Sequence, residues 1–312
     1  MDVEITKAGG TRTKLSEIGV EVRDFIVSSI EMRPIYSAIE GRSGHVNMGA
    51  DYGTRSITVP FYFKAADLQD VALARDELFG LVTNAEPFFI REMRRIKEHP
   101  GIICDDPTDT RKHKKYDYDN FFVGGKRYKV RLASSFDIDQ AFRYGFGELV
   151  FETTDLPFAE SIGTTADIDR NGINADGGLW GFGMGLQSVD ETLRYKHSVD
   201  AGQSFRIFNA GNVAVHPFQQ DLKITISDVV GSDRAFQMNN LTNGSMFWTN
   251  VAVKKSDTIV IDGANVTRNG LSFLRDTGRR FIELSPGWNE FNVLSLLSGS
   301  ATVEFDFRFY YL

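Results

Sequence analysis

Residues 41–83 read GRSGHVNMGADYGTRSITVPFYFKAADLQDVALARDELFGLVT and combine two glycine-rich segments, a strand and a helix. Glycine accepts a positive φ without steric cost, so we expect turns at 41–44 and 49–53. Residues 54–63 alternate apolar and polar side chains, which is the period of a half-buried strand, and Pro60 favours an edge position or an outward-facing nitrogen. The apolar set of this strand is Ile57, Val59, Phe61 and Phe63.

The helix of this stretch is predicted near 67–83. Asp67 is the expected N-cap, and Asp70 in the first turn complements the helix dipole. The apolar residues at helical spacing are Leu68, Val71, Ala72, Leu78, Phe79 and Val82. The sequence therefore predicts one helix packed on a sheet, and no other convincing helix in the chain.

Composition limits the class of protein. A chain of 312 residues with 42% hydrophobic residues suggests two domains with ample core, and 25 Phe with 29 Gly suit short aromatic strands joined by tight turns. The net charge of −7 argues against a general nucleic-acid binder. A single cysteine excludes an intramolecular disulfide framework. Neither a secretory signal nor a bilayer-spanning apolar run is visible, so we expect a soluble protein made inside a cell.

The remaining segments predict a mainly β chain of two domains, 1–160 and 161–312. Before the boundary, strands are expected at 20–27, 87–90, 121–123, 128–132 and 148–152, with a hairpin turn at 124–127. After it, strands are expected without an intervening helix at 204–208, 222–226, 246–253, 258–261, 281–284 and 301–311. In the last strand Val303, Phe305, Phe307 and Phe309 share one face. The second half is therefore predicted to be an all-β sandwich.

No catalytic or metal-binding arrangement is predicted. The five histidines, His45, His99, His113, His197 and His216, lack the spacing of a helical zinc site. Residues 105–109 lack the glycine and glutamate of a calcium loop, and residues 181–185 lack the following helix of a phosphate loop. Cys104 has histidines near it only in sequence, and no Gly-x-Ser-x-Gly motif is present. We expect no enzyme, no cofactor and no metal, and a zinc or cysteine hydrolase is the least favoured reading.

Two features remain as candidate contact sites. Trp288 can be read as a sugar-stacking residue or as a side chain packed under a turn, and the second reading is favoured. The basic run Arg111, Lys112, Lys114 and Lys115 lies in the long segment 91–120 and can be read as a solvated loop, a nucleic-acid contact or a protein interface. These like charges repel one another unless carboxylates or phosphates lie opposite, so we expect this run to face an acidic surface of a neighbouring subunit or partner.

Several motifs resemble the distal tail protein family (Dit) of long-tailed phages and prophages of Gram-positive bacteria. The N-terminal motifs are Leu15–Val20 running into Asp24–Phe25, Gly41–Gly44, Gly53–Val59 with the following helix, and Pro157–Ser161. Those resembling the galectin-like module of the same family are Phe208–Asn212, Ile259–Gly263, Pro286–Asn289 and Phe305–Tyr311. The resemblance covers nearly the whole chain and rests on the order of these motifs.

The resemblance implies a β-sandwich or barrel-like N-terminal domain with one helix, followed by a galectin-like sandwich. It also implies a hexameric ring at the virion tail tip, assembled in the bacterial host cytoplasm. The partners it implies are the tail tube protein, a tail-associated lysin or fibre hub protein, and receptor-binding or baseplate proteins, with no specific nucleic acid and no membrane. The alternative is a carbohydrate-binding module for attachment to the host cell wall. Because no cluster of sugar-bonding side chains is evident around Trp288, we expect a lectin-like shape without sugar recognition.

Overall fold

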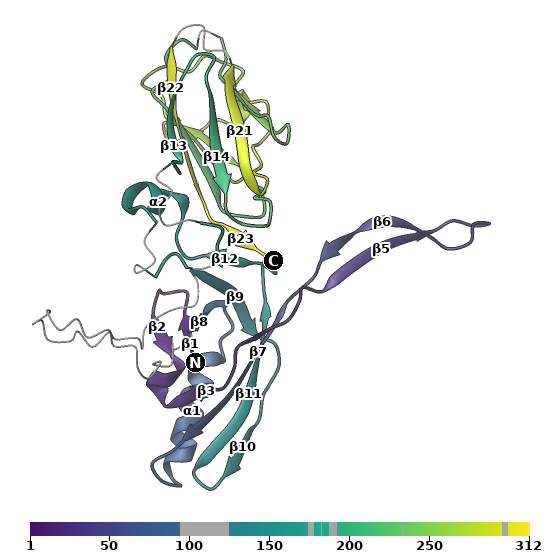
Figure 1. The fold of residues 1–312 in the computed structure, drawn as a ribbon, viewed down its shortest axis with the longest axis vertical. Coiled ribbons are helices and arrows are strands. Elements are labelled where there is room, and N and C mark those ends of the chain that lie inside the picture. The colour runs from purple at the N-terminus through teal and green to yellow at the C-terminus, as the bar shows by residue number, and fades with distance from the viewer. Residues whose placement is uncertain (94–124, 174–177, 182, 187–191, 233, 295–298) are drawn as a thin grey trace, which may run out of the picture. The chain divides into compact units, whose positions relative to one another are not determined.

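The structure is a computed structural model that describes residues 1–93, 125–173, 178–181, 183–186, 192–232, 234–294 and 299–312. It divides into two compact units (Figure 1). The N-terminal unit comprises Met1–Val123 and Arg127–Pro157, and the C-terminal unit comprises Gly124–Lys126 and Phe158–Leu312. The division predicted between residues 160 and 161 lies close to Pro157.

An antiparallel sheet forms the frame of the N-terminal unit. Its strands are β1 (Asp2–Thr6), β2 (Arg12–Lys14), β3 (Val20–Val22), β4 (Ile26–Val27), β7 (Ser56–Lys64), β8 (Phe88–Met93), β9 (Lys126–Leu132), β10 (Ile138–Ala141) and β11 (Tyr144–Thr153). They follow the order β2-β1-β8-β9-β11-β7-β3, while β10 pairs with β11 and β4 pairs with β7. A short 3-10 helix, Leu15–Ile18, links β2 to β3. The predicted strand at 121–123 lies outside the described residues.

Strand β7 organises this sheet as its alternation predicts. Its four apolar residues Ile57, Val59, Phe61 and Phe63 are all buried. The strand is not at an edge, because β11 lies on one side of it and β3 and β4 lie on the other. The backbone N–H of Arg23 donates to the Pro60 carbonyl at 2.9 Å, and Pro60 has no N–H to return the bond. The strand predicted at 20–27 is accordingly split into β3 and β4 opposite this proline.

Helix α1 (Asp70–Val82) packs on the sheet as predicted. The N-cap position is Gln69 rather than the predicted Asp67, but the Asp67 carboxylate accepts the backbone N–H groups of Gln69 at 2.7 Å and Asp70 at 2.9 Å and so holds the turn that leads into the helix. Leu68 is exposed because it precedes the first helical turn, and Ala72 is also exposed, so both were wrongly assigned to the core. The buried residues of the helix are Val71, Leu78, Leu81 and Val82.

Residues 49–53 do not form the predicted turn. They belong mostly to β6 (His45–Tyr52), which pairs with β5 (Met32–Ala38) in a separate hairpin whose tip contains the correctly predicted turn at 41–44. The pairing register shifts between Ile35 and Tyr36, which lie opposite Gly49 and Asn47, so Met48 is an extra residue in β6. Gly49 has φ of +119° at this irregularity, which explains a glycine inside a strand.

Two sheets build the sandwich of the C-terminal unit. Its strands are β13 (Lys196–Asp200), β14 (Ser204–Asn209), β15 (Leu222–Ser227), β16 (Gln237–Asn240), β17 (Met246–Trp248), β18 (Ile259–Asp262), β19 (Asn265–Arg268), β20 (Leu271–Ser272), β21 (Gly287–Leu294) and β22 (Ser300–Phe307). One sheet has the order β13-β22-β15-β18-β19-β20 and the other has the order β14-β21-β16-β17. Between them Phe291 lies 5.3 Å from Phe205 and 5.1 Å from Phe305, measured between ring centroids. The mainly β prediction is confirmed.

Three details of the C-terminal unit differ from the sequence expectation. A second helix, α2 (Thr165–Asn171), is present, and the Asp167 carboxylate accepts the Thr164 backbone N–H at 2.9 Å to cap it. Residues 281–284 form no strand. The predicted last strand is interrupted, because β22 ends at Phe307 and β23 (Tyr310–Tyr311) pairs instead with β12 (Ala159–Ser161). Val303, Phe305, Phe307 and Phe309 are nevertheless all buried, as predicted.

A shielded ion pair ties β19 to the loop that precedes β18. Asp257 pairs with the Arg268 guanidinium and also accepts bonds from the Lys254 backbone N–H at 2.8 Å and the Asn269 amide at 3.1 Å. Burial raises the pKa of Asp257, but these hydrogen bonds outweigh it, so the net pKa lies below the ordinary value of 3.8. The carboxylate therefore stabilises the fold fully above pH 3.8 and loses this effect as pH falls through the lower, folded-state pKa.

We expect Asp257→Asn to lower the free energy of unfolding of the C-terminal unit by about 3 kcal/mol at pH 7, because the substitution leaves the shielded Arg268 charge without its carboxylate partner. Urea denaturation at several pH values measures this, and the difference from the unsubstituted chain should shrink below pH 3.8. Asp262→Asn, at an exposed position of β18, is the matched control. A pH-independent difference would contradict the assignment.

Candidate interaction surfaces

The β5–β6 hairpin of the N-terminal unit is exposed along nearly its whole length. Every residue of β5 is exposed, and in β6 only Val46 is half-buried. Figure 1 shows the hairpin extending away from the sheet of its own unit. Because a two-stranded hairpin alone is at best marginally stable in water, this element is suited to contact with another surface.

The hairpin register separates its side chains into two faces. Met32 pairs with Tyr52, and Tyr36 pairs with Asn47, so these four residues share one face with Pro34 and Ala50. We call Met32, Pro34, Tyr36, Ala50 and Tyr52 the apolar hairpin face. Met32, Tyr36 and Tyr52 are 54%, 60% and 51% exposed. The opposite face carries Arg33, Ile35 and Asp51, and Arg33 pairs with Glu31 at 2.8 Å. Such a row of exposed apolar side chains is typical of an interaction surface.

A second apolar strip lies on the outer side of β7 and β11. Tyr62 stacks on Phe146 at 6.2 Å, and Phe146 stacks on Tyr144 at 6.3 Å between ring centroids. The Tyr62 hydroxyl donates a hydrogen bond to Glu21, which raises the pKa of that tyrosine. Phe146 is 40% exposed, so this aromatic strip is also open to a partner.

In the C-terminal unit, Trp288 lies on β21 rather than under a turn. Its ring lies 4.9 Å from the Phe208 ring, and the Arg206 guanidinium lies 4.8 Å from its centroid. The indole is 40% exposed. Asn289 is fully buried and fixes the preceding turn, because its side chain bonds the Ser285 N–H at 2.9 Å and the Ser285 carbonyl at 2.8 Å. Trp288 therefore stands on a rigid strand with part of its surface available.

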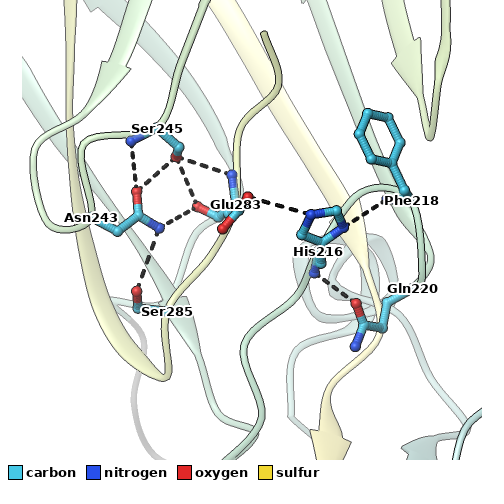
Figure 2. Close-up of polar contacts among 7 residues, drawn as sticks. All are labelled: His216, Phe218, Gln220, Asn243, Ser245, Glu283 and Ser285. Atoms are coloured by element: carbon cyan, nitrogen blue, oxygen red, sulfur yellow. Dashed lines mark hydrogen bonds and ion pairs between the residues drawn. The ribbon is translucent and has the colours of Figure 1, made fainter. Parts of the chain in front are cut away.

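A polar network holds the segment that leads into this turn (Figure 2). Asn243 donates to the Glu283 carbonyl at 2.9 Å, and the Ser245 hydroxyl accepts the Glu283 N–H at 3.0 Å. These side chains satisfy the backbone groups of Glu283, which explains why residues 281–284 form no strand. On the other side, His216 Nε2 lies 3.4 Å from the Glu283 carboxylate. His216 Nδ1 accepts the Phe218 N–H at 3.2 Å, so this histidine joins two loops.

The other predicted site residues lie mostly outside the part of the chain that the structure describes. Arg111, Lys112, Lys114 and Lys115 lie outside the described residues, as do Cys104, His99, His113 and residues 105–109, and the expectation for the basic run stays a prediction. Within the described ranges, no three His, Cys, Asp or Glu side chains gather as they would around a metal ion. Nor does a helix of the described segments have the length and apolar character to cross a membrane.

Comparison with known proteins gave one family match and several similar solved structures. Residues 13–153 match the family described as phage tail protein RIFT-related domain. No curated protein matches the chain. Among solved structures, the Dit protein (gp 19.1) of phage SPP1 has 12% identity and a TM-score of 0.59, with 99% of this chain and 98% of that chain covered. Its description calls it a paradigm of the hub adsorption apparatus in phages that infect Gram-positive bacteria.

Two structures of the phage p2 baseplate in its activated conformation, with Sr and with Ca, also match. Each has 10% identity, and their TM-scores are 0.37 and 0.36. The first covers 98% of this chain and 97% of that chain, and the second covers 97% of each. Residues 13–153 thus resemble a phage tail protein RIFT-related domain, and the chain as a whole has the fold of the SPP1 Dit protein.

Proposed function

We propose that this protein is a structural component of a phage tail tip: a distal tail protein that forms a ring and joins the tail tube to the baseplate. The observation that carries the proposal is the exposure of the apolar hairpin face, on which Met32 is 54% and Tyr36 is 60% exposed. The RIFT-related domain match and the fold shared with the SPP1 hub protein support the same conclusion. The role requires no catalysis, and no enzymatic activity is proposed.

The two exposed strips support the proposed ring. The apolar hairpin face and the aromatic strip of Tyr62, Tyr144 and Phe146 are different surfaces of one unit. When one surface of a chain binds a different surface of the next copy, the contact is heterologous, and it gives a ring when the rotation between copies closes and an open filament when it does not. We propose six copies, with the hairpin of each packed on its neighbour through its apolar face.

The proposed partners are those of a hub. The ring contacts the tail tube protein, and a tail-associated lysin or fibre hub protein, while the C-terminal units hold receptor-binding or baseplate proteins. The location is the tip of the virion tail, after assembly in the host cytoplasm. The basic run Arg111, Lys112, Lys114 and Lys115 is proposed to face an acidic surface of a neighbour or partner, because these like charges repel one another unless carboxylates lie opposite.

The proposal is tested by removing the apolar hairpin face. We expect the triple variant Met32→Ser, Tyr36→Ser, Tyr52→Ser to lose ring formation, since each buried anchor of an interface contributes about 2 kcal/mol, or roughly thirtyfold in affinity. Analytical ultracentrifugation and imaging of tail tips by electron microscopy measure assembly. The melting temperature should hardly change, because these side chains are exposed in the single chain.

Ile35→Ser is the matched control, because Ile35 is 47% exposed on the opposite face of the same hairpin. It should leave assembly intact. Rings of normal mass from the triple variant, or a tail tip without a closed ring containing this protein, would refute the proposal.

A further inference from the structure

The outer face of the β14-β21-β16-β17 sheet brings together side chains that are far apart in the sequence. Arg206 on β14 lies directly opposite Glu290 on β21, and Phe208 lies opposite Trp288. Trp288 and Glu290 are two residues apart on one strand, so their side chains share a face. We call Arg206, Phe208, Trp288 and Glu290 the Trp288 face. These four side chains lie together only because β14 pairs with β21, about 80 residues further along the chain. The sequence does not show this pairing, and for that reason no sugar-bonding cluster around Trp288 was expected.

The charged groups of this face keep their hydrogen-bonding capacity. Arg206 and Glu290 are exposed and paired in register, yet no ion pair within 4.0 Å joins them in the described structure. The Arg206 guanidinium lies over the Trp288 ring instead, at 4.8 Å from its centroid. Neither the guanidinium nor the Glu290 carboxylate has a hydrogen-bond partner among the described residues. The five N–H donors of Arg206 and the two carboxylate oxygens of Glu290 therefore remain available for hydrogen bonds to a ligand beside the exposed indole.

The Asn292 side chain, on the same side of the sheet, has a carbonyl oxygen that accepts no hydrogen bond from the described residues. Asn292 follows Glu290 by two residues on β21 and lies opposite Asn239 of β16. Its Oδ1 atom is shielded from solvent and has no hydrogen-bond partner among the described residues. An unpaired shielded acceptor is unfavourable until a donor is supplied. Asn292 therefore adds a second hydrogen-bond acceptor next to Glu290 on β21.

The Trp288 face is held rigidly. Asn289, the residue between Trp288 and Glu290, points inward and bonds the Asn240 amide at 3.0 Å in addition to Ser285. The network of Figure 2 fixes Glu283 just before this turn. Binding groups carried on strands and supported by buried hydrogen bonds lose little freedom when a ligand arrives.

We propose that the Trp288 face binds a neutral glycan. The exposed indole offers an apolar surface to the C–H groups of a sugar ring, the guanidinium donates to hydroxyl oxygens, and the carboxylate accepts from hydroxyl groups. The adjacent opposite charges disfavour a polyanion, which Glu290 repels, and a polycation, which Arg206 repels. A polyhydroxylated neutral ligand satisfies both groups at once. This binding role is independent of ring formation by the N-terminal unit.

Titration of the full chain with neutral oligosaccharides tests the proposal. The probes are oligomers of N-acetylglucosamine, glucose, galactose and rhamnose, with poly(glycerol phosphate) as the anionic comparison, followed by calorimetry and by NMR. At least one neutral oligosaccharide should bind at about 10 mM, where a millimolar Kd is detectable. Trp288→Ala and Glu290→Gln should each weaken that binding by about tenfold or more.

Glu290→Gln keeps the shape of the side chain, so it remains informative if Trp288→Ala unfolds. Leu271→Ala is the control, because Leu271 is 75% exposed on the other sheet, and it should bind as the unsubstituted chain does. The proposal is overturned if no neutral oligosaccharide binds, if both variants bind normally, or if the poly(glycerol phosphate) probe binds more tightly than the neutral sugars.

Discussion

Removing residues 300–312 is expected to unfold the C-terminal unit. Strand β22 lies between β13 and β15, so its loss divides one of the two sheets. It also removes Phe305, Phe307 and Phe309, each at most 1% exposed. Truncating one buried phenylalanine costs about 3–5 kcal/mol, and three such losses approach or exceed the total stability of a domain, about 5–15 kcal/mol.

Thermal unfolding and limited proteolysis of the truncated chain measure this effect. The transition of the C-terminal unit should disappear, while the N-terminal unit, which has its own buried core, should still unfold cooperatively. Removing Leu312 alone, which is 51% exposed, serves as the control and should change little. A truncated chain with both transitions intact would show that the last strand is dispensable.

Phe291→Ala is expected to have the largest effect of any single substitution considered. Its ring is fully buried between Phe205 and Phe305, with centroids 5.3 Å and 5.1 Å away, so alanine leaves a cavity between the two sheets. We expect a loss of about 4 kcal/mol in the free energy of unfolding of the C-terminal unit.

Chemical denaturation measures this loss, and Phe218→Ala is the comparison. Phe218 is 56% exposed and contacts Phe281 on the surface, so its removal should cost less than about 1 kcal/mol. Equal losses at the two positions would mean that Phe291 does not occupy the centre of the sandwich.

The sequence predicted elements whose side chains alternate between core and solvent. Strand β7 and the terminal strand were found in this way, because burial on one face imposes a period of two. Helix α1 was found from the aspartate that precedes it and from its apolar spacing, although Leu68 and Ala72 were placed in the core and the buried Leu81 was omitted. Sequence patterns therefore predicted those strands and that helix whose formation depends on nearby residues.

The sequence failed where distant contacts decide the conformation. Residues 281–284 are apolar enough for a strand, but Asn243 and Ser245 bond the Glu283 backbone instead. Gly49 suggests a turn, yet it lies at an irregularity within the β5–β6 hairpin. Helix α2 had a readable signal in Thr164 and Asp167, whose three-residue spacing forms its capping box.

The candidate surfaces were less predictable than the fold. Trp288 was identified, but its neighbours Arg206 and Glu290 come from two strands whose pairing no local pattern shows. The apolar hairpin face was missed altogether, since its residues were assigned to turns or left unassigned. A surface formed across strands depends on register, and register is set by the whole sheet.

The links between the two ends of the C-terminal unit determine when it is able to fold. The Ser161 hydroxyl accepts the Phe309 N–H across 148 residues, and the Thr165 hydroxyl accepts the Phe307 N–H across 142. At a synthesis rate of about 5–20 residues per second, the ribosome needs about 7–30 s to make the intervening chain. Closure of this unit therefore waits until β22 and the residues after it have been made, and such long-range pairing slows folding further. During that interval its first strand and helix must remain soluble without their final partners.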